Sequence, residues 1–210
     1  MIRCLAIGDA HIPRRAKSIP DGILNKLNEL SEQKSFDYTF FTGDLITAFE
    51  FIDFLKLKTI NNVFIVIGNM DYYGGNRSSP IYQNLGIKFL DNENLSIGLT
   101  HGHQIEPRGD HSQLEYFALN EKGCNILISG HTHKEEIFLT NKGILLLNPG
   151  SVTGAWSFIA SGIPSFININ INEDNKYIEV ILFQLDNRSK EINELKSYFI
   201  FKNNSIHYRF

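Results

Sequence analysis

The stretch LISGHTHK, residues 127–134, places two histidines one residue apart, directly after an apolar run and a glycine. Such a run, ended by glycine, indicates a buried strand that leads into a turn. Histidines in that position serve either as metal ligands or as ordinary polar turn residues. His131 and His133 alone do not distinguish these interpretations, so the remaining strand ends have to be compared with this one.

The same arrangement, an apolar run followed by a polar cluster, occurs at four other points of the chain. The runs IRCLAI, YTFFT, VFIVI and LSIGLT lead respectively into Gly8-Asp9-Ala10-His11, Gly43-Asp44, Gly68-Asn69-Met70-Asp71 and His101-Gly102-His103. Each cluster taken alone is more often a plain turn than a site. Five clusters that all follow strands, and that hold most of the histidines, favour a shared functional site.

The segments between the early strands are helix-like. SIPDGILNKLNELSEQ, residues 18–33, has Pro20 in a first-turn position and an apolar stripe at Ile23, Leu24, Leu27 and Leu30. Alternating strands and helices predict a layered α/β domain. In such domains ligands bind at the carboxyl ends of the strands, where the polar clusters lie.

The second half of the chain predicts antiparallel hairpins. EEIFLT and ILLLN flank the turn at residues 141–143, and SFINININ and KYIEVILFQL flank the turn at residues 173–175. We therefore expect an α/β fold in which two β-sheets pack as a sandwich flanked by helices, an αββα arrangement. Residues 1–186 are expected to form this domain. Residues 187–210 form an Asn-rich C-terminal extension, either disordered or adding a strand to the same domain.

Composition narrows the class of protein. With 210 residues, 42% hydrophobic and 20% charged, the chain fits one globular domain. A formal charge of -3 gives no electrostatic footprint for nucleic acid. No apolar run has the length of a membrane span, and no secretory pattern opens the chain, so we expect a cytoplasmic protein. Cys4 and Cys124 lie in apolar runs, which predicts buried, reduced thiols.

The pooled polar clusters form a typical metal-binding donor set. The candidate ligands are Asp9, His11, Asp44, Asn69, His101, His131 and His133. Imidazole, carboxylate and amide donors without a thiolate favour Mn²⁺, Zn²⁺ or Fe²⁺ over Ca²⁺ and Mg²⁺. Seven donors are too many for one tetrahedral ion but fit two ions that share a carboxylate. Along an extended chain alternate side chains point the same way, so each Asp-x-His or His-x-His pair is expected to grip one centre.

The motifs GDAH, GDL, GNMD, HGH and GHTH, in this order over residues 8–133, resemble those of the calcineurin-like metallophosphoesterases. The longer stretches GDAHIPRR, HGHQIEPRGD, LISGHTHK and NPGSVTGAW are similar to the family of the retromer small subunit and to its archaeal and bacterial phosphodiesterase relatives. The likeness continues to about residue 185 and leaves most of the tail outside it.

This resemblance implies a ligand set for two divalent metal ions, with Mn²⁺ expected first and Zn²⁺ or Fe²⁺ as alternatives. It implies that Asp44 bridges the ions, that one ion is held by Asp9, His11 and His133, and that the other is held by Asn69, His101 and His131. The eukaryotic retromer subunit has lost the bridging aspartate, whereas this chain retains Asp44. Metal binding is therefore expected.

One position departs from the family pattern. Many members have a proton-donating histidine where this chain has Met70, and a thioether has no proton to give. Asp71 and His103 are the candidates for the catalytic role, His103 more as a residue that orients the site. The arginines that follow metal motifs are the candidates for phosphate contacts, namely Arg14, Arg15 and Arg108, with Arg14 and Arg108 preferred.

Two functions remain open at this stage. The closer likeness predicts a scaffold of a retromer-like trafficking complex that docks a helical-repeat large subunit, keeps an intact binuclear site and lies on membranes only through its partner. The alternative is an active metal-dependent phosphodiesterase that hydrolyses a phosphodiester or an activated phosphoester. The complete ligand set favours the enzyme. In the retromer subunit an apolar pair after HGHQ contacts the partner, and here Ile105-Glu106 stands in its place.

Overall fold

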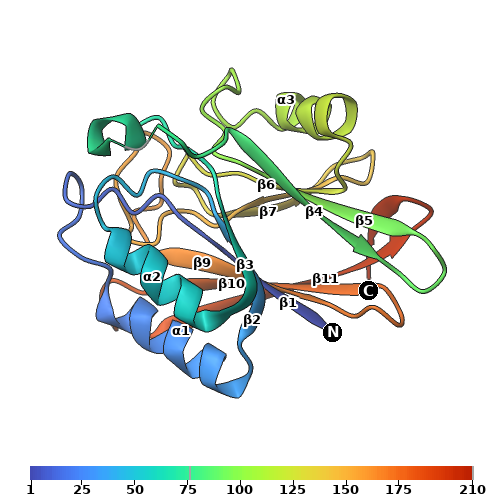
Figure 1. The fold of residues 1–210 in the computed structure, drawn as a ribbon, viewed down its shortest axis with the longest axis horizontal. Coiled ribbons are helices and arrows are strands. Elements are labelled where there is room, and N and C mark those ends of the chain that lie inside the picture. Colours follow the sequence, from blue (N-terminus) through green and yellow to red (C-terminus); the bar gives the residue numbers. More distant parts are fainter. Residues whose placement is uncertain (76, 210) are drawn as a thin grey trace.

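The fold is a sandwich of two mixed β-sheets, seen edge-on in Figure 1. The computed structural model describes residues 1–75 and 77–209. The seven-stranded sheet has the order β12 (Ser205–Tyr208), β11 (Ile192–Lys202), β10 (Tyr177–Leu185), β9 (Ser165–Ile171), β1 (Ile2–Ile7), β2 (Phe36–Phe41), β3 (Thr59–Ile65). The five-stranded sheet has the order β4 (Tyr82–Lys88), β5 (Asn94–Thr100), β6 (Ile126–Ile128), β8 (Leu145–Asn148), β7 (Glu136–Leu139).

Helices cover both outer faces of the sandwich. α1 (Asp21–Gln33) and α2 (Phe49–Lys58) lie below the seven-stranded sheet in Figure 1, and α3 (His111–Tyr116) lies above the five-stranded one. A short 3-10 turn, η1 (Asp71–Gly74), follows β3, and a π-helical turn, η2 (Phe117–Lys122), continues α3. The expectation of a two-sheet sandwich flanked by helices is confirmed.

The first three strands are parallel, as the strand-helix alternation predicts. β1 pairs in parallel with β2, and β2 with β3, while β9 joins the other side of β1 in antiparallel orientation. The predicted hairpins are present as β7–β8 and β9–β10. Consequently the carboxyl ends of β1 and β2 open at one end of the sandwich, where their polar clusters lie.

Two apolar layers hold this arrangement together. Between the sheets, Phe40, Ile97 and Ile128 are fully buried, and burial of such side chains stabilises the fold by about 1.5–3 kcal/mol each. Under α1, Ile23 and Leu27 of the predicted stripe are buried against the outer face of the seven-stranded sheet. Both layers fix the strand ends rigidly.

The outer face of the five-stranded sheet is covered by α3 and η2. Leu114 and Phe117 pack there with Leu127 and Cys124. Both cysteines of the chain are buried and free, as predicted. Burial raises the pKa of the Cys124 thiol to about 11, so this thiol is an inert part of the packing.

The C-terminal residues form two further strands of the seven-stranded sheet. β11 pairs with β10 along its length, from Leu185↔Ile192 to Tyr177↔Ile200, and β12 pairs with β11. Phe199 and Phe201 are buried in the layer between the sheets. The extension therefore shares the main core.

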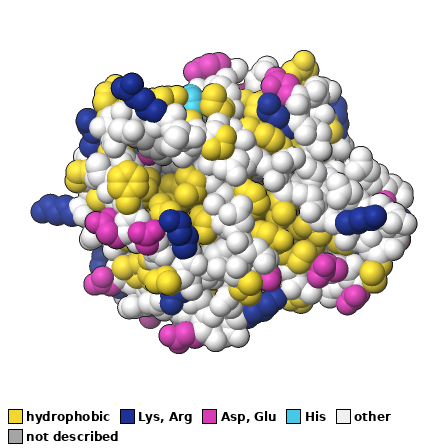
Figure 2. Space-filling view, in the orientation of Figure 1, with side chains coloured by type: hydrophobic (Ala, Val, Ile, Leu, Met, Phe, Trp, Pro, Cys, Tyr) yellow, Lys and Arg dark blue, Asp and Glu magenta, His cyan; other side chains and the backbone are white. Residues whose placement is uncertain are grey.

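The loops after β1, β2, β3 and β6 gather at the left end of the molecule in Figure 1, together with the loop after β8. In the same orientation, Figure 2 shows hydrophobic side chains reaching the surface along the middle of the molecule, where the edge strands of the two sheets lie. Among the helices in the described part of the chain, none is both long and apolar enough to cross a membrane.

Candidate metal centre

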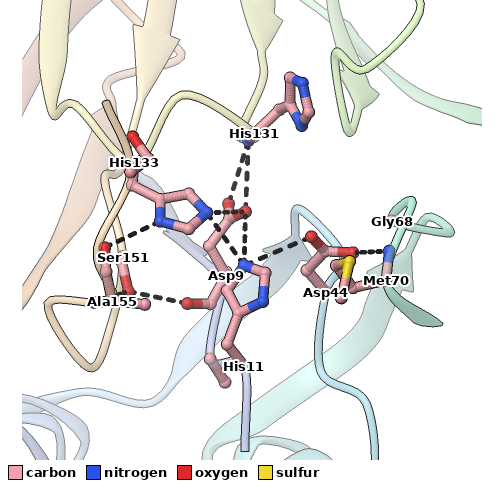
Figure 3. Close-up of polar contacts among 12 residues, drawn as sticks. Asp9, His11, Asp44, Gly68, Met70, His131, His133, Ser151 and Ala155 are labelled. Carbon is pink, nitrogen blue, oxygen red and sulfur yellow. Dashed lines mark hydrogen bonds and ion pairs between the residues drawn. The ribbon is translucent and has the colours of Figure 1, made fainter. Parts of the chain in front are cut away.

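The loops after β1 and β6 bring Asp9, His11 and His133 into one buried cluster (Figure 3). His133 Nε2 lies 3.3 Å from Asp9 Oδ1, and His11 Nε2 lies 3.8 Å from the same oxygen. The two Nε2 atoms are 2.9 Å apart. All three side chains are almost completely shielded from solvent. Among the residues that the structure describes, this is one of two groups of donors close enough to share an ion.

The second group consists of Asp9, Asp44 and His101, which lie directly beside the first. Asp44 Oδ2 is 3.5 Å from His101 Nε2 and 3.3 Å from His11 Nε2, so it lies between the two groups. Asn69 Oδ1 is 3.1 Å from His101 Nε2. Six of the seven ligands suggested by the sequence thus converge within hydrogen-bonding range of a neighbour.

The hydrogen-bond partners of two rings leave lone pairs directed at these carboxylates. His133 Nδ1 donates to the Ala155 carbonyl at 2.8 Å, and His101 Nδ1 donates to the Thr42 carbonyl at 2.7 Å. A carbonyl oxygen only accepts, so in each neutral ring the hydrogen is on Nδ1 and Nε2 carries a lone pair. Converging lone pairs and carboxylate oxygens repel one another unless a cation lies among them. The donor set therefore fits divalent metal ions.

The backbone of these loops is strained. The residues of the clusters with left-handed φ angles near 50–70° are Asp9, His11, Asp44, His131 and His133. For residues other than glycine this conformation costs roughly 1–3 kcal/mol each and persists where the surroundings impose it. The hydrogen bonds from His11 N to the Asp44 carbonyl and from Asp9 N to the Gly43 carbonyl, both 2.9 Å, hold two of these loops together. The side chains are thus preorganised.

The acidic groups are electrostatically coupled to the histidines. Burial raises the pKa of Asp9. Hydrogen bonding to His11 and His133, which requires a proton on Nε2 of these rings where a metal ion would otherwise lie, outweighs that effect, and the pKa lies well below its usual value. Burial, with the neighbouring charge of Asp9, raises the pKa of Asp44. Two adjacent buried carboxylates with opposite shifts are an arrangement that bound cations relieve.

His131 does not follow the expected pairing with His133. Its backbone N–H donates to both carboxylate oxygens of Asp9 at 3.3 Å, while its ring points away from Asp9 and Asp44 in Figure 3. The ring centroid lies 5.1 Å from that of His101. Burial, with the nearby charges of His101 and Arg108, lowers the pKa of His131 to about 3, so its ring is neutral. The expectation of extended chain is wrong for both pairs, because Asp9 and His11, like His131 and His133, have left-handed backbone.

Asp71 holds loops together instead of facing the cluster as a proton donor. Its carboxylate is buried and accepts backbone hydrogen bonds from Gly68 N at 2.8 Å and from Asp44 N and Ile46 N at 2.9 Å. Both oxygens are already occupied as acceptors. These contacts fix the loop of Asp44, and we therefore propose that Asp71 is a positioning residue in place of a proton donor.

Met70 and His103 lie at the edge of the cluster. The Met70 backbone N–H donates to Asp44 Oδ1 at 2.7 Å, so the residue contributes to the site through its backbone. The His103 ring is half-buried, 5.4 Å from the His101 ring. Burial, with the charge of His101, lowers the pKa of His103. His103 Nδ1 has no hydrogen-bond partner among the described residues, so this ring retains a free nitrogen near the cluster.

The three candidate arginines are exposed and differ in their contacts. The Arg14 guanidinium lies 4.9 Å from the centre of the Tyr73 ring, and Arg15 Nη1 donates to the Trp156 carbonyl at 2.9 Å. Arg108 is close enough to His131 to affect its pKa. Arg108 therefore lies on the His131 side of the site, whereas Arg14 and Arg15 connect neighbouring loops.

The loop after β8 braces the cluster; its sequence, with small residues and backbone N–H groups, is equally compatible with an approach to the site and with a plain turn. Ser151 Oγ donates to the Asp9 carbonyl at 2.7 Å and accepts from Ala155 N at 2.8 Å. Ala155 is the residue whose carbonyl orients His133 (Figure 3). Asn148 Nδ2 donates to the Gly130 carbonyl at 3.0 Å. The stretch NPGSVTGA was the only available signal, and a plain turn explains such a stretch equally well.

Comparison with known proteins places this arrangement in a family. The model of the calcineurin-like phosphoesterase superfamily domain matches residues 2–173. The chain belongs to this superfamily. A probable metallophosphoesterase of Methanothermobacter thermautotrophicus is 36% identical over 148 residues, which cover 70% of this chain and 75% of the relative. The resemblance seen in the sequence motifs is thereby confirmed.

Solved structures similar to this superfamily member include vacuolar protein sorting 29 proteins. The Cryptosporidium parvum protein has a TM-score of 0.78 and 31% identity, covering 95% of this chain and 98% of its own. Vps29 of Entamoeba histolytica, complexed with Zn²⁺, has a TM-score of 0.75 and 31% identity, covering 93% and 99% of the two chains. Both similarities cover more of the chain than the residues that the family model matches.

Proposed function

We propose that this member of the calcineurin-like phosphoesterase superfamily is a metal-dependent phosphodiesterase with a binuclear centre. The observation that carries the proposal is the convergence of the Asp9 and Asp44 carboxylates with the Nε2 atoms of three histidines in a buried, strained setting. We propose Mn²⁺ as the native ion, with Zn²⁺ or Fe²⁺ as alternatives.

The residues divide into two groups toward the metals. Asp9, His11 and His133 would hold one ion, Asn69 and His101 the other, and Asp44 would contact both. Two divalent cations, when bound, neutralise phosphate oxygens and generate a nucleophile from water at neutral pH. A rotation of the His131 side chain would add a further donor to the second group, since its ring lies beside that of His101.

The side chains around the cluster limit the substrates. Met70 supplies no proton to a leaving group, and general-acid assistance is worth about 10²–10⁴-fold in rate. His103 has a ring nitrogen near the second group that has no hydrogen-bond partner among the described residues. Because its pKa is lowered, this ring is a poor proton donor at neutral pH. We therefore propose diesters and activated esters as substrates in place of alkyl monoesters. Arg108 is the residue that we propose for contact with the phosphate.

A retromer-like docking function is the second candidate. The near-complete coverage of the Vps29 structures favours it, and with it a cytoplasmic protein held peripherally on membranes by a helical-repeat large subunit. At the position of the apolar pair, however, Ile105 is only 6% exposed and packs against Leu114, while Glu106 is exposed. A buried isoleucine and a charged neighbour offer little apolar surface to a partner. We therefore place the phosphodiesterase first.

The test combines metal analysis with an assay on bis(p-nitrophenyl) phosphate. We expect purified protein to carry up to two metal ions per chain and to hydrolyse the diester, and we expect Asp44→Asn to lose both properties. Asp53→Asn is the matched control, because Asp53 is an exposed partner of Lys56 on α2. Bound metal without turnover of any phosphoester, together with capture of a purified helical-repeat retromer subunit, would favour the docking function instead.

A further inference from the structure

The loop between β8 and β9 lies at the end of the sandwich that carries the metal centre (Figure 1). This loop holds an exposed aromatic pair. Trp156 is 64% exposed and Phe158 is 87% exposed. Their ring centroids are 5.0 Å apart with an edge-to-face inclination of 61°. Large aromatic side chains are costly to leave in water, so two of them side by side indicate a surface that binds something.

The backbone under Trp156 is tied directly to the metal centre. The carbonyl of Ala155, the preceding residue, accepts from His133 Nδ1 at 2.8 Å. The carbonyl of Trp156 itself accepts from Arg15 Nη1 at 2.9 Å. Ser151 holds the same loop through Ala155 N. The indole is therefore exposed on a fixed base, and a preordered ring loses little conformational entropy when a ligand stacks on it.

The surroundings of this pair are cationic. Arg15 lies at the Trp156 carbonyl, and its charge is close enough to affect the pKa of His133. Arg14 lies over the Tyr73 ring, on the loop that follows Asn69. A fixed aromatic surface beside arginines and a phosphate-binding centre matches a ligand that contains both an anion and a planar ring.

We propose that Trp156, supported by Phe158, is a stacking subsite for a planar aromatic group esterified to the phosphate, such as a nucleobase or an aryl ring. The phosphate would lie at the metal centre, and the ring would lie against the exposed indole. This proposal rests on the proposed phosphodiesterase function. It adds a preference among substrates: nucleoside or aryl phosphodiesters over esters of simple alcohols.

The test uses the fact that Trp156 is the only tryptophan of the chain. Its fluorescence reports this subsite alone. The probes are adenosine 5′-monophosphate and ribose 5-phosphate, which differ by the base, added to the zinc-loaded protein. We expect the nucleotide to quench the fluorescence saturably and to bind about tenfold more tightly than ribose 5-phosphate, measured by competition.

Variants separate stacking from a general effect on the loop. By calorimetry, Trp156→Ala should raise the Kd of the nucleotide about tenfold and leave that of ribose 5-phosphate unchanged, while Trp156→Phe should retain most of the preference. On bis(p-nitrophenyl) phosphate, Trp156→Ala should raise KM more than it lowers kcat. Tyr198→Ala, which removes an exposed ring on β11, is the control and should behave as wild type.

The outcomes distinguish this proposal from the proposed function. Saturable quenching without hydrolysis of any ester would overturn the phosphodiesterase and leave the subsite intact. Hydrolysis with equal affinity for the two probes would overturn the subsite and leave the phosphodiesterase intact. Absence of quenching, or an unchanged nucleotide Kd in Trp156→Ala, would also overturn the subsite.

Discussion

Replacement of Asp71 tests whether it positions loops or donates a proton. Its Oδ2 accepts from Gly68 N and Asp44 N, and its Oδ1 accepts from Ile46 N, all three at 2.8–2.9 Å and buried. A buried backbone N–H left without a partner costs about 1–3 kcal/mol. Asp71→Ala leaves three such N–H groups without a partner, so we expect the free energy of unfolding to fall by at least about 3 kcal/mol.

Asp71→Asn is the milder variant and gives a graded prediction. The amide oxygen of the asparagine can still accept from two backbone N–H groups, so only one N–H group is left without a partner. The free energy of unfolding is therefore expected to fall by about 1–3 kcal/mol. For a chain of this size each kcal/mol lowers Tm by roughly 2–4 °C. The assay is urea unfolding followed by circular dichroism, with metal removed by a chelator so that metal binding does not contribute.

An exposed carboxylate on α2 provides the control for these variants. Asp53→Ala removes an exposed carboxylate paired with Lys56 at 2.9 Å, and such pairs are worth about 0–1 kcal/mol. If Asp71→Asn were as stable as the Asp53 variant and yet lost diester hydrolysis more than 100-fold, Asp71 would be a catalytic acid, and our revision of its role would be wrong.

Three further substitutions test other parts of the site. Ser151→Ala removes the hydrogen bonds to Asp9 and Ala155 and should weaken Mn²⁺ binding about tenfold in calorimetry without unfolding the protein. Unchanged affinity would show that these hydrogen bonds do not support the metal centre. Gly130→Ala would place a Cβ 2.2 Å from Asp9 Oδ2, so metal content should fall sharply, and full occupancy would contradict the geometry. Met70→His should raise the rate on alkyl monoesters at least tenfold, and an unchanged rate would disprove our explanation of Met70.

Much of the fold follows from local patterns in the sequence. The runs that form β1, β2, β5 and β6 are apolar and end in glycine or polar residues, so their positions follow from periodicity and turn chemistry. The hairpins β7–β8 and β9–β10 follow in the same way. No comparable local pattern marks β4 or α3, and α2 follows only from the general alternation of strands and helices. The sequence of β4, YQNLGIK, contains a glycine and few strand-favouring residues, and its pairing with β5 is a tertiary effect.

The site was predictable in its membership and less so in its geometry. Donor types after strand ends indicate which side chains meet, because strand ends converge in a sheet. The direction of the His131 ring depends on a left-handed backbone, which no residue pattern reveals in a non-glycine residue. The Ser151 brace joins residues 142 positions apart, and the Asp71 contacts join separate loops. Such contacts arise only once the sheets have formed.

The most direct measurement of the central claim is anomalous diffraction at the manganese edge from crystals soaked in Mn²⁺. We predict two peaks. One should lie among Asp9, His11 and His133, the other beside His101 and Asn69, with the Asp44 carboxylate between them. Crystals with no peak at these side chains, or with manganese bound only elsewhere on the molecule, would contradict the account.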